Sequence, residues 1–581
     1  MKIHVHVVLL SLVSLVPLTT EAQQTPPDIA AAARTNAEQQ QQVQQQRDAQ
    51  QRAATVAAPV VRSTAPAAGE WPVLPVETPC FRIDSFSVDV PNTLPKAVRV
   101  KGASALPMNP FAFLHDWLRH YEGQCVGKQG LDMLTRGLQG VILSRGYITT
   151  RVLLPAQDLS KGTLRFALIP GVIRNLKFAD ANTRGTLKSA FPARDGDVLQ
   201  LRDLEQGLEQ MKRVPNQDAT MQIVPGTSPG ESDVVVAVKR SKPWSFVVSA
   251  DNSGTAETGR YIGNVSLALY NPLGLNDVLS GGFNQDLQFG NHDLGTHGWN
   301  ASYAIPWGYW TGTLYGYTNT YYQQIAAVNQ TFVASGNAQT AGLKLERVFY
   351  RSQNDVSGLE FQLVKRWGAS FIEDTEIPQQ YRDNTFIEAG LTNRHYFGAA
   401  QFDGTLAYRQ GIGGLGAQPD TPGGPTYRFK MATLDANLSV PFAVIGQALR
   451  YVGTVHGQFT NDELNYIDDL TIGSRYTVRG FSGQTMLAAE KGFYWRNELQ
   501  YPLGQSRQVL YAGIDYGHLW GPSTANLAGT QLAGAAIGVK GSVPTCLGAY
   551  SYDVFVGTPI YAPSGFPAPS VTLGFQVTAQ F

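Results

Sequence analysis

The sequence predicts a membrane β-barrel of about 16 antiparallel strands, preceded by two small α+β domains. Three observations support this fold class. Charged residues make up 15% of the chain, well below the quarter that is usual in soluble globular proteins, and glycine, tyrosine and phenylalanine are abundant. The C-terminal part alternates apolar and polar residues, and no later apolar run is long enough to cross a membrane as a helix. A small α/β pattern occurs twice before the alternating region.

Residues 1–22 have the pattern of a secretory signal peptide. Lys2 supplies the positive start, Val5–Leu18 the apolar stretch, and Thr20-Glu21-Ala22 a cleavage site of small residues. The apolar stretch is too short and too interrupted by serine to span a membrane. We therefore expect export.

Export permits disulfides, and the chain has three cysteines. Cys80 and Cys125 lie in the same N-terminal region, and we favour a disulfide between them over two buried thiols. Such a bridge would contribute roughly 3–4 kcal/mol. Cys546 is left over, with no assigned role.

Residues 23–79 are compositionally biased. The glutamine-rich run Glu38–Arg47 contains good helix formers and no Gly or Pro, but it has almost no apolar face. The residues alone leave two alternatives, disorder or a helix in a wet channel, and they favour disorder. Prolines recur through residues 58–79 and predict a stiff, extended linker.

A β-α-α-β-β pattern then occurs twice, in residues 80–170 and 171–240, with Pro170-Gly171 at the boundary. Any α+β domain can imitate one copy. In the first copy we expect strands at 81–90, 147–154 and 163–169, and helices at 110–121 and along the apolar stripe of Leu131, Leu134, Leu138, Val141 and Ile142. In the second we expect strands at 172–178, 219–224 and 232–239, and a helix carrying Leu201, Leu204, Leu208 and Met211.

Residues 241–581 alternate apolar and polar side chains, as at 434–442 and 573–581. This period of two, apolar outside and polar inside, is what a membrane barrel with a wet lumen requires. A soluble β-sandwich is the alternative, but the length fits one large barrel better. Phe575 and Phe581 on the last strand look like the C-terminal signal that directs barrels to the outer membrane.

Two short motifs place one charge each among glycines and aromatics, Tyr476–Phe481 and Gly513–Gly517. Arginine is the natural partner of a carboxylate where water is scarce, because its rigid fork of donors stays charged. For either motif alone, a solvated loop arginine or strand aspartate is an equally good interpretation. Their presence together on a barrel sequence favours a pairing.

On these residues the chain resembles the TpsB transporters of two-partner secretion, which belong to the same superfamily as the barrel-assembly proteins. Val478, Arg479, Gly480 and Phe481 match the VRGF loop motif of that family, and Gly513, Asp515 and Gly517 match its GxDxG strand motif. Further similarity lies in Leu154–Leu159 and Gly162–Leu164, at the end of a POTRA domain, in Asp251–Gly254, at the first barrel strand, and in Trp495–Leu499. Cys80 and Cys125 favour the haemolysin or contact-dependent-inhibition branch.

The resemblance implies a plug helix at 23–57, a linker at 58–79, two periplasmic POTRA domains and an outer-membrane barrel over 241–581. It also implies that a loop around 470–490 folds inwards, so that Arg479 meets Asp515 as a latch. The implied partner is one large secreted TpsA-type exoprotein, whose N-terminal secretion domain the POTRA domains bind by edge-strand pairing before the barrel exports it unfolded. The other implied partners are outer-membrane lipid and, during biogenesis, the barrel-assembly machinery, and we expect a monomer.

No enzyme, cofactor or metal signature is found in the sequence. Gly411–Gly416 fits GxGxxG formally, but a turn follows it instead of the helix that would bind a pyrophosphate. The histidines have no metal-ligand spacing, and a formal net charge of zero gives no electrostatic case for nucleic acid. The competing interpretations are a barrel-assembly protein, a passive porin and an outer-membrane receptor or adhesin. The identity of the exported partner and the resting position of the plug helix stay open.

Overall fold

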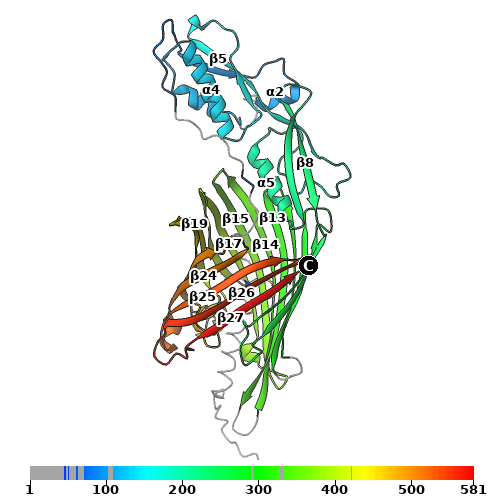
Figure 1. Ribbon diagram of the computed structural model, residues 1–581, viewed down its shortest axis with the longest axis vertical. Coiled ribbons are helices and arrows are strands. Elements are labelled where there is room, and N and C mark those ends of the chain that lie inside the picture. Colours follow the sequence, from blue (N-terminus) through cyan, green and yellow to red (C-terminus); the bar gives the residue numbers. More distant parts are fainter. Residues whose placement is uncertain are drawn as a thin grey trace, which may run out of the picture.

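The computed structural model describes residues 45–47, 50, 61–62, 71–102, 109–288, 294–326, 331–420, 422–504 and 506–581. Two small α/β domains lie one above the other at one end of a large β-barrel (Figure 1). The predicted signal peptide lies outside the described residues, and so do most of the predicted plug helix and much of the linker. The fold class predicted from the sequence is confirmed: two α+β domains precede an antiparallel barrel.

The first domain packs short helices against a three-stranded sheet of order β2-β5-β4, in which β2 is parallel to β5. The leucine stripe of α4 is buried against β5 residues such as Phe166 and Leu168. Its elements are β1 Phe81–Arg82, β2 Ser85–Asp89, α2 Lys96–Gly102, α3 Phe113–Arg119, β3 Cys125–Val126, α4 Lys128–Ser144, β4 Arg151–Leu153, η1 Leu159–Lys161 and β5 Thr163–Ile169.

Three details of this domain differ from the sequence prediction. The strand expected at 81–90 is split, because β1 pairs with β3 and β2 pairs with β5. The strand expected at 147–154 is reduced to β4, since the backbone N–H of Thr150 bonds the carbonyl of Tyr147 in a turn. Helix α2 was not predicted, although Pro95 directly before it is a residue that commonly begins helices.

Residues 71–79, predicted as linker, lie against the first domain. The Tyr121 hydroxyl donates to the Pro72 carbonyl at 3.0 Å, and Leu74 packs on the domain core. The Glu77 carboxylate accepts from the backbone N–H groups of Gln129 and Gly130, both at 2.8 Å, at the start of α4. Such a carboxylate satisfies free N–H groups and complements the helix dipole, so this end of the linker is fixed.

The second domain repeats the sheet topology, with order β6-β8-β7 and β6 parallel to β8. Helix α5 buries its predicted leucine and methionine stripe in the core. Turns replace a helix between β6 and α5, so the β-α-α-β-β unit is complete only in the first copy. The elements are β6 Val172–Phe178, α5 Leu201–Lys212, β7 Gln217–Pro225 and β8 Glu231–Arg240.

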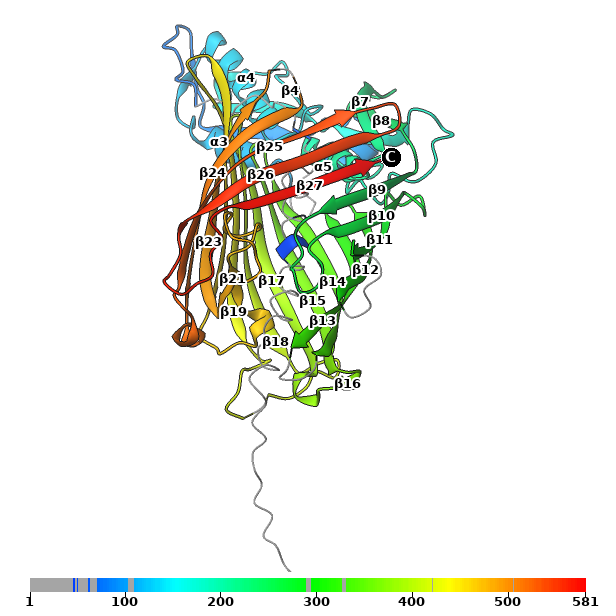
Figure 2. The same ribbon diagram turned by 60° about the horizontal axis from the view of Figure 1, so that its bottom comes forward.

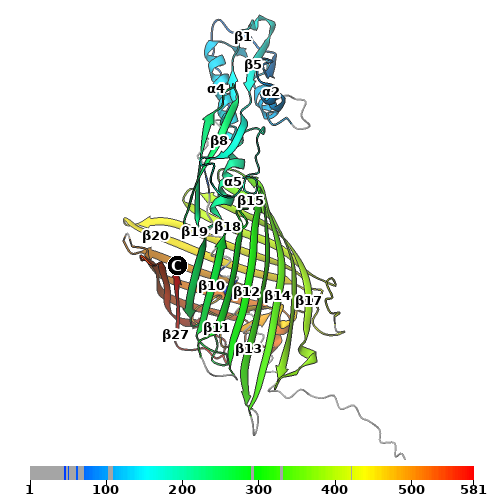
Figure 3. The same ribbon diagram turned by 90° about the vertical axis from the view of Figure 1, so that its right-hand side faces the viewer.

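Helix α5 also rests on the barrel end that faces the small domains (Figure 3). Gln210 Nε2 donates to the Gly308 carbonyl at 3.1 Å, and the Tyr309 hydroxyl bonds Asp203. Arg351, whose side chain is 3% exposed, bonds Glu209 and donates to Gln206 Oε1 at 2.8 Å. The second domain is therefore joined to the barrel by buried polar contacts.

In the described part of the chain, sixteen long strands close the barrel, each antiparallel to its neighbours, and β27 returns to pair with β9 (Figure 2). The two-residue strand β16 Thr375–Glu376 extends a hairpin at the end of β15. The long strands are β9 Trp244–Asp251, β10 Ile262–Tyr270, β11 Val278–Asp286, β12 Gly295–Trp307, β13 Trp310–Ala326, β14 Thr331–Arg351, β15 Asp355–Ile372, β17 Arg382–Phe397, β18 Ala400–Ile412, β19 Lys430–Val444, β20 Gln447–Thr460, β23 Lys491–Pro502, β24 Gln508–Trp520, β25 Gln531–Pro544, β26 Ala549–Tyr561 and β27 Thr572–Gln580.

The two faces of the barrel strands differ as the alternation predicts. Leu406 on β18 is 55% exposed on the outer surface, and Val265, Leu267 and Leu269 are exposed in the same way on β10. Many inner side chains are polar or charged and buried, among them Glu360, Arg366, Glu388 and Asp403. An apolar exterior around a polar interior is the surface of a membrane barrel. The helices of the described residues are too short or too polar to span a membrane.

Candidate functional site

The segment between β20 and β23, residues 461–490, folds into the barrel, and we call it the inward loop. It contains η3 Tyr466–Asp468 and a hairpin of β21 Leu470–Ile472 with β22 Leu487–Ala489. The hairpin belongs to an apolar cluster that also includes Leu519 of β24 and Leu532 of β25. Burying this apolar surface holds the loop against one wall of the barrel.

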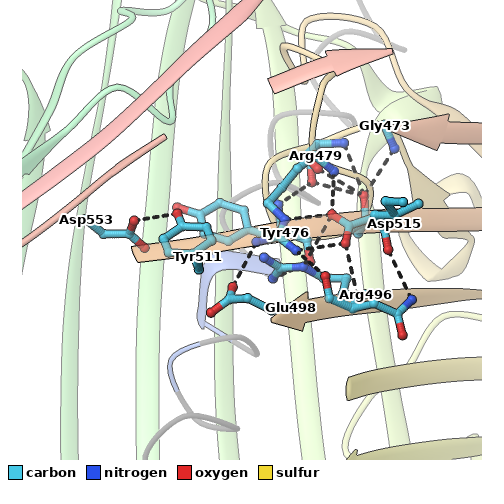
Figure 4. Close-up of polar contacts among 12 residues, drawn as sticks. Gly473, Tyr476, Arg479, Arg496, Glu498, Tyr511, Asp515 and Asp553 are labelled. Atoms are coloured by element: carbon cyan, nitrogen blue, oxygen red, sulfur yellow. Dashed lines mark hydrogen bonds and ion pairs between the residues drawn. The ribbon is translucent and has the colours of Figure 1, made fainter. Parts of the chain in front are cut away.

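A tight turn within the inward loop aims Arg479 at that wall. The Thr477 hydroxyl oxygen accepts from the backbone N–H groups of Gly473 and Ser474, both at 3.1 Å. The N–H of Val478 bonds the Ser474 carbonyl at 3.1 Å. These bonds leave Arg479 at the tip, directly opposite β24 (Figure 4).

The structure brings Arg479 and Asp515 together. Arg479 Nε donates to Asp515 Oδ2 at 2.7 Å, and Nη2 donates to Oδ1 at 2.9 Å. The same carboxylate accepts from the backbone N–H groups of Arg479 at 3.0 Å and Asn497 at 3.2 Å. The side chains are 3% and 0% exposed. This is a bidentate, buried pair in which the carboxylate is fully hydrogen-bonded.

Glu498 of β23 is a second carboxylate at this site, and the sequence motifs did not assign it. Arg479 Nη1 donates to Glu498 Oε2 at 2.9 Å, and Lys540 of β25 bonds the other oxygen of Glu498. Glu498 lies within Trp495–Leu499, a segment that resembles the family. That resemblance was the only feature of the sequence that could have pointed to Glu498. The guanidinium therefore joins strands β23 and β24 at once.

The motif glycines provide space for the loop. A Cβ atom on Gly513 would lie 2.4 Å from Arg479 Nη2, and one on Gly517 would lie 2.9 Å from Ile472. Gly480 has a φ of +107°, which favours glycine, and it packs on the backbone of Thr558. Gly534 of β25 also borders Arg479, and Gly557 of β26 borders Gly480. The tip of the loop thus lies directly on the backbone of the wall.

Val478 and Phe481 complete the VRGF motif with apolar contacts. Both are buried in the apolar cluster of the inward loop, and the Phe481 ring meets Phe566 edge-on, with 5.8 Å between the ring centroids. The two side chains anchor the loop on either side of Arg479.

The described residues of the glutamine-rich run touch the inward loop and the barrel wall. Gln45, Gln46 and Arg47 are helical. Gln45 bonds Thr471 and accepts from the Ser474 hydroxyl at 2.6 Å, and Gln46 Nε2 donates to Asp251 Oδ2 at 3.3 Å. These residues are in the lumen, whereas the rest of the predicted plug helix at 23–57 lies mostly outside the described residues.

The other predicted site residues lie away from the tip of the loop. Cys80 and Cys125 form a disulfide in the first domain, with 5.5 Å between their Cα atoms, and Cys546 is an exposed free thiol. Phe581 exchanges two backbone hydrogen bonds with Phe246 of β9, and Phe575 lies on β27 beside the first strand. Among the described residues, no group of three or more His, Cys, Asp and Glu side chains is arranged to hold a metal ion.

The comparisons with known proteins agree on one family. The family model "Haemolysin secretion/activation protein ShlB/FhaC/HecB" matches residues 230–541, and two POTRA domain models match residues 94–171 and 172–225. The outer membrane transporter CdiB-2 of Burkholderia pseudomallei is 62% identical over 99% of both chains. Solved structures of CdiB from Escherichia coli and from Acinetobacter baumannii have TM-scores of 0.80 and 0.82, at 26% and 25% identity. They cover 97% and 94% of this chain and 100% and 99% of their own.

Proposed function

The chain belongs to the family of haemolysin secretion/activation proteins ShlB/FhaC/HecB, and we propose that it exports one large partner protein through its own barrel. It is an outer-membrane transporter of two-partner secretion, and its POTRA domains lie in the periplasm. The family excludes the porin and receptor interpretations. It also favours export over barrel assembly, because CdiB-2 of Burkholderia pseudomallei, which is 62% identical to this chain, is named as an outer membrane transporter.

The POTRA domains are the recognition part of the proposal. Each sheet ends in two edge strands, β2 and β4 in the first domain and β6 and β7 in the second, and β6 is already partly bonded to residues 196–198. Edge-strand pairing suits an unfolded partner, because backbone hydrogen bonds form with any sequence. The exported chain then enters the barrel extended. Export needs no ATP, since folding of the partner outside prevents its return. The transporter acts as a monomer, after insertion by the barrel-assembly machinery.

The buried Arg479–Asp515 pair is the observation that carries the mechanism. It fixes the inward loop within the pore, so that the loop lines the path of the exported chain. Breaking a buried pair on one side leaves an uncompensated charge and costs about 3–5 kcal/mol, less where water enters the lumen. The pair is thus strong enough to act as a latch. Its loss is expected to move the loop without unfolding the barrel, since the strand ladders are intact.

The test is secretion of the partner by Arg479→Ala and Asp515→Ala variants, co-expressed with the partner from the neighbouring gene. Both variants should reach the outer membrane in normal amounts, measured by heat-modifiable migration, while the partner in the medium falls strongly. Arg450→Ala is the matched control, because Arg450 is an exposed arginine of β20. Normal secretion by Arg479→Ala would refute the latch.

A further inference from the structure

The barrel closes through a short seam between its first and last strands. The ladder of β9 with β27 has five register pairs, from Asp251 with Gln576 to Val247 with Gln580. The adjacent ladders, β9 with β10 and β26 with β27, have eight and nine. Because β9 ends at Asp251 whereas β27 begins at Thr572, part of the last strand lacks a backbone partner on the β9 side.

The side chain of Asn252 continues this ladder beyond the end of β9. Its Nδ2 donates to the Leu573 carbonyl at 2.7 Å, and its Oδ1 accepts from the Phe575 N–H at 2.8 Å. A carboxamide has a donor and an acceptor, like a peptide group, so it can replace one in a strand ladder. Because the backbone N–H of Asn252 also bonds the Phe575 carbonyl, at 3.4 Å, this end of the seam depends on the contacts of one residue, Asn252.

Arg475 of the inward loop bonds both Asn252 and the last strand next to it. Its Nη1 donates to Asn252 Oδ1 at 3.0 Å and to the Phe575 carbonyl at 3.2 Å. Its guanidinium also lies 5.4 Å from the centre of the Phe555 ring on β26. Hydrogen bonds from a charged donor are stronger than those from a neutral one. One arginine thus links the first strand, the last strand and the loop.

We propose that Arg475 is a positioning residue that holds the β9–β27 seam closed. The tight turn at Ser474–Val478 contains Arg475 and directly precedes Arg479, so the two arginines move together. Arg479 fixes the loop on β23 and β24. The fixed loop in turn holds Arg475 where it can bond Asn252 and Phe575 at the seam. Displacement of the loop therefore loosens this strand pair selectively. The inference concerns barrel closure and does not require the proposed export function.

The test measures cross-linking between cysteines at register partners, in a Cys546→Ser background. The seam pair is Ala250→Cys with Val577→Cys, and the control pair is Leu406→Cys with Leu434→Cys, between β18 and β19. Arg475→Ala should slow disulfide formation at the seam, because losing the two charge-assisted hydrogen bonds lowers the closed-to-open ratio of this strand pair by about tenfold or more. The control pair should keep its rate, and Arg475→Lys should restore part of the seam rate.

Two outcomes would overturn the proposal. One is an unchanged seam rate in Arg475→Ala. The other is an equal slowing at both pairs, which would mean general loosening of the barrel. If Arg475→Ala does not fold, Asn252→Ala removes the same hydrogen bonds from the barrel side. It must then slow disulfide formation at the seam pair and leave the control pair unchanged. All measurements use the full chain in membranes and do not depend on secretion.

Discussion

A Cβ atom added to Gly534 would lie 1.7 Å from the carbonyl oxygen of Arg479. Glycine at this position of β25 lets the loop tip lie directly on the wall. We expect Gly534→Ala to displace the tip while leaving all charged groups of the latch in place. Overpacking of this kind costs about 1–3 kcal/mol. Secretion of the partner should fall towards the level of Arg479→Ala, at a normal amount of folded barrel.

The matched control is Gly312→Ala on β13, where the nearest heavy atom to the added Cβ is 3.6 Å away. This variant should secrete normally. Full secretion by Gly534→Ala would show that the close packing of the tip is dispensable.

Gln45 is expected to hold the plug on the inward loop. Gln45→Ala removes hydrogen bonds to Thr471 and Ser474, together worth about 2 kcal/mol. The pore should then open more often, by roughly thirtyfold in the open-to-closed ratio. Single-channel conductance in planar bilayers measures that ratio. Gln50→Ala is the control, because Gln50 is helical and exposed. Equal conductance of the two variants would argue against plug docking on the loop.

Local patterns predicted much of the fold. The alternation at 434–442 located β19, which spans Lys430–Val444, and helical spacing located α4 and α5, because each of these elements buries one face. The split of β1 from β2 was missed, since it results from a change of pairing partner that no local pattern encodes.

The same limit applies to the functional site. Arg479 and Asp515 could be paired from their motifs, but Glu498 and Gly534 join the site through contacts between distant segments. A glycine within a strand signals close backbone approach, but 59 glycines do not indicate which one receives the loop. The role of Arg475 likewise depends on Asn252, more than 200 residues earlier in the chain.

Asp233 is expected to make the second POTRA domain sensitive to acid. Hydrogen bonds from Arg174, then Asn175 and Lys177, hold the pKa of the Asp233 carboxyl well below its usual range. In the unfolded chain this carboxyl has a pKa near 3.9. Its contribution to stability is therefore present above about pH 4 and is lost as the pH falls towards the folded pKa.

Hydrogen exchange of β8 at decreasing pH measures this effect. Asp233→Asn should lower the protection of the β8 amides against exchange at neutral pH. It should also make that protection fall less as the pH decreases. Asp180→Asn, at an exposed loop position, is the control and should behave like the unchanged chain. An acid response that is identical with and without Asp233 would contradict the assignment.

A second ion pair ties the inward loop to the opposite part of the barrel. Arg366 Nη1 of β15 donates to Asp468 Oδ1 of η3 at 2.7 Å, and the side chains are 11% and 0% exposed. Gln458 of β20 also donates to the Asp468 carbonyl at 2.8 Å. The loop is thus held at its entry as well as at its tip, and either attachment alone limits how far it can move.

Asp468→Asn should leave Arg366 without its anion and weaken the loop entry by about 3 kcal/mol, the lower end for a buried pair because the lumen is hydrated. A cysteine at Ala488, which is 3% exposed, reports loop opening through its reaction with a membrane-impermeant maleimide in a Cys546→Ser background. Labelling should be faster in Asp468→Asn than in the control Glu463→Gln, an exposed position of the same loop. Because the two anchors hold one loop, combining Asp468→Asn with Arg479→Ala should accelerate the labelling by more than the two single substitutions predict when their free energies are added. Strict additivity would show that the anchors act on separate parts of the loop.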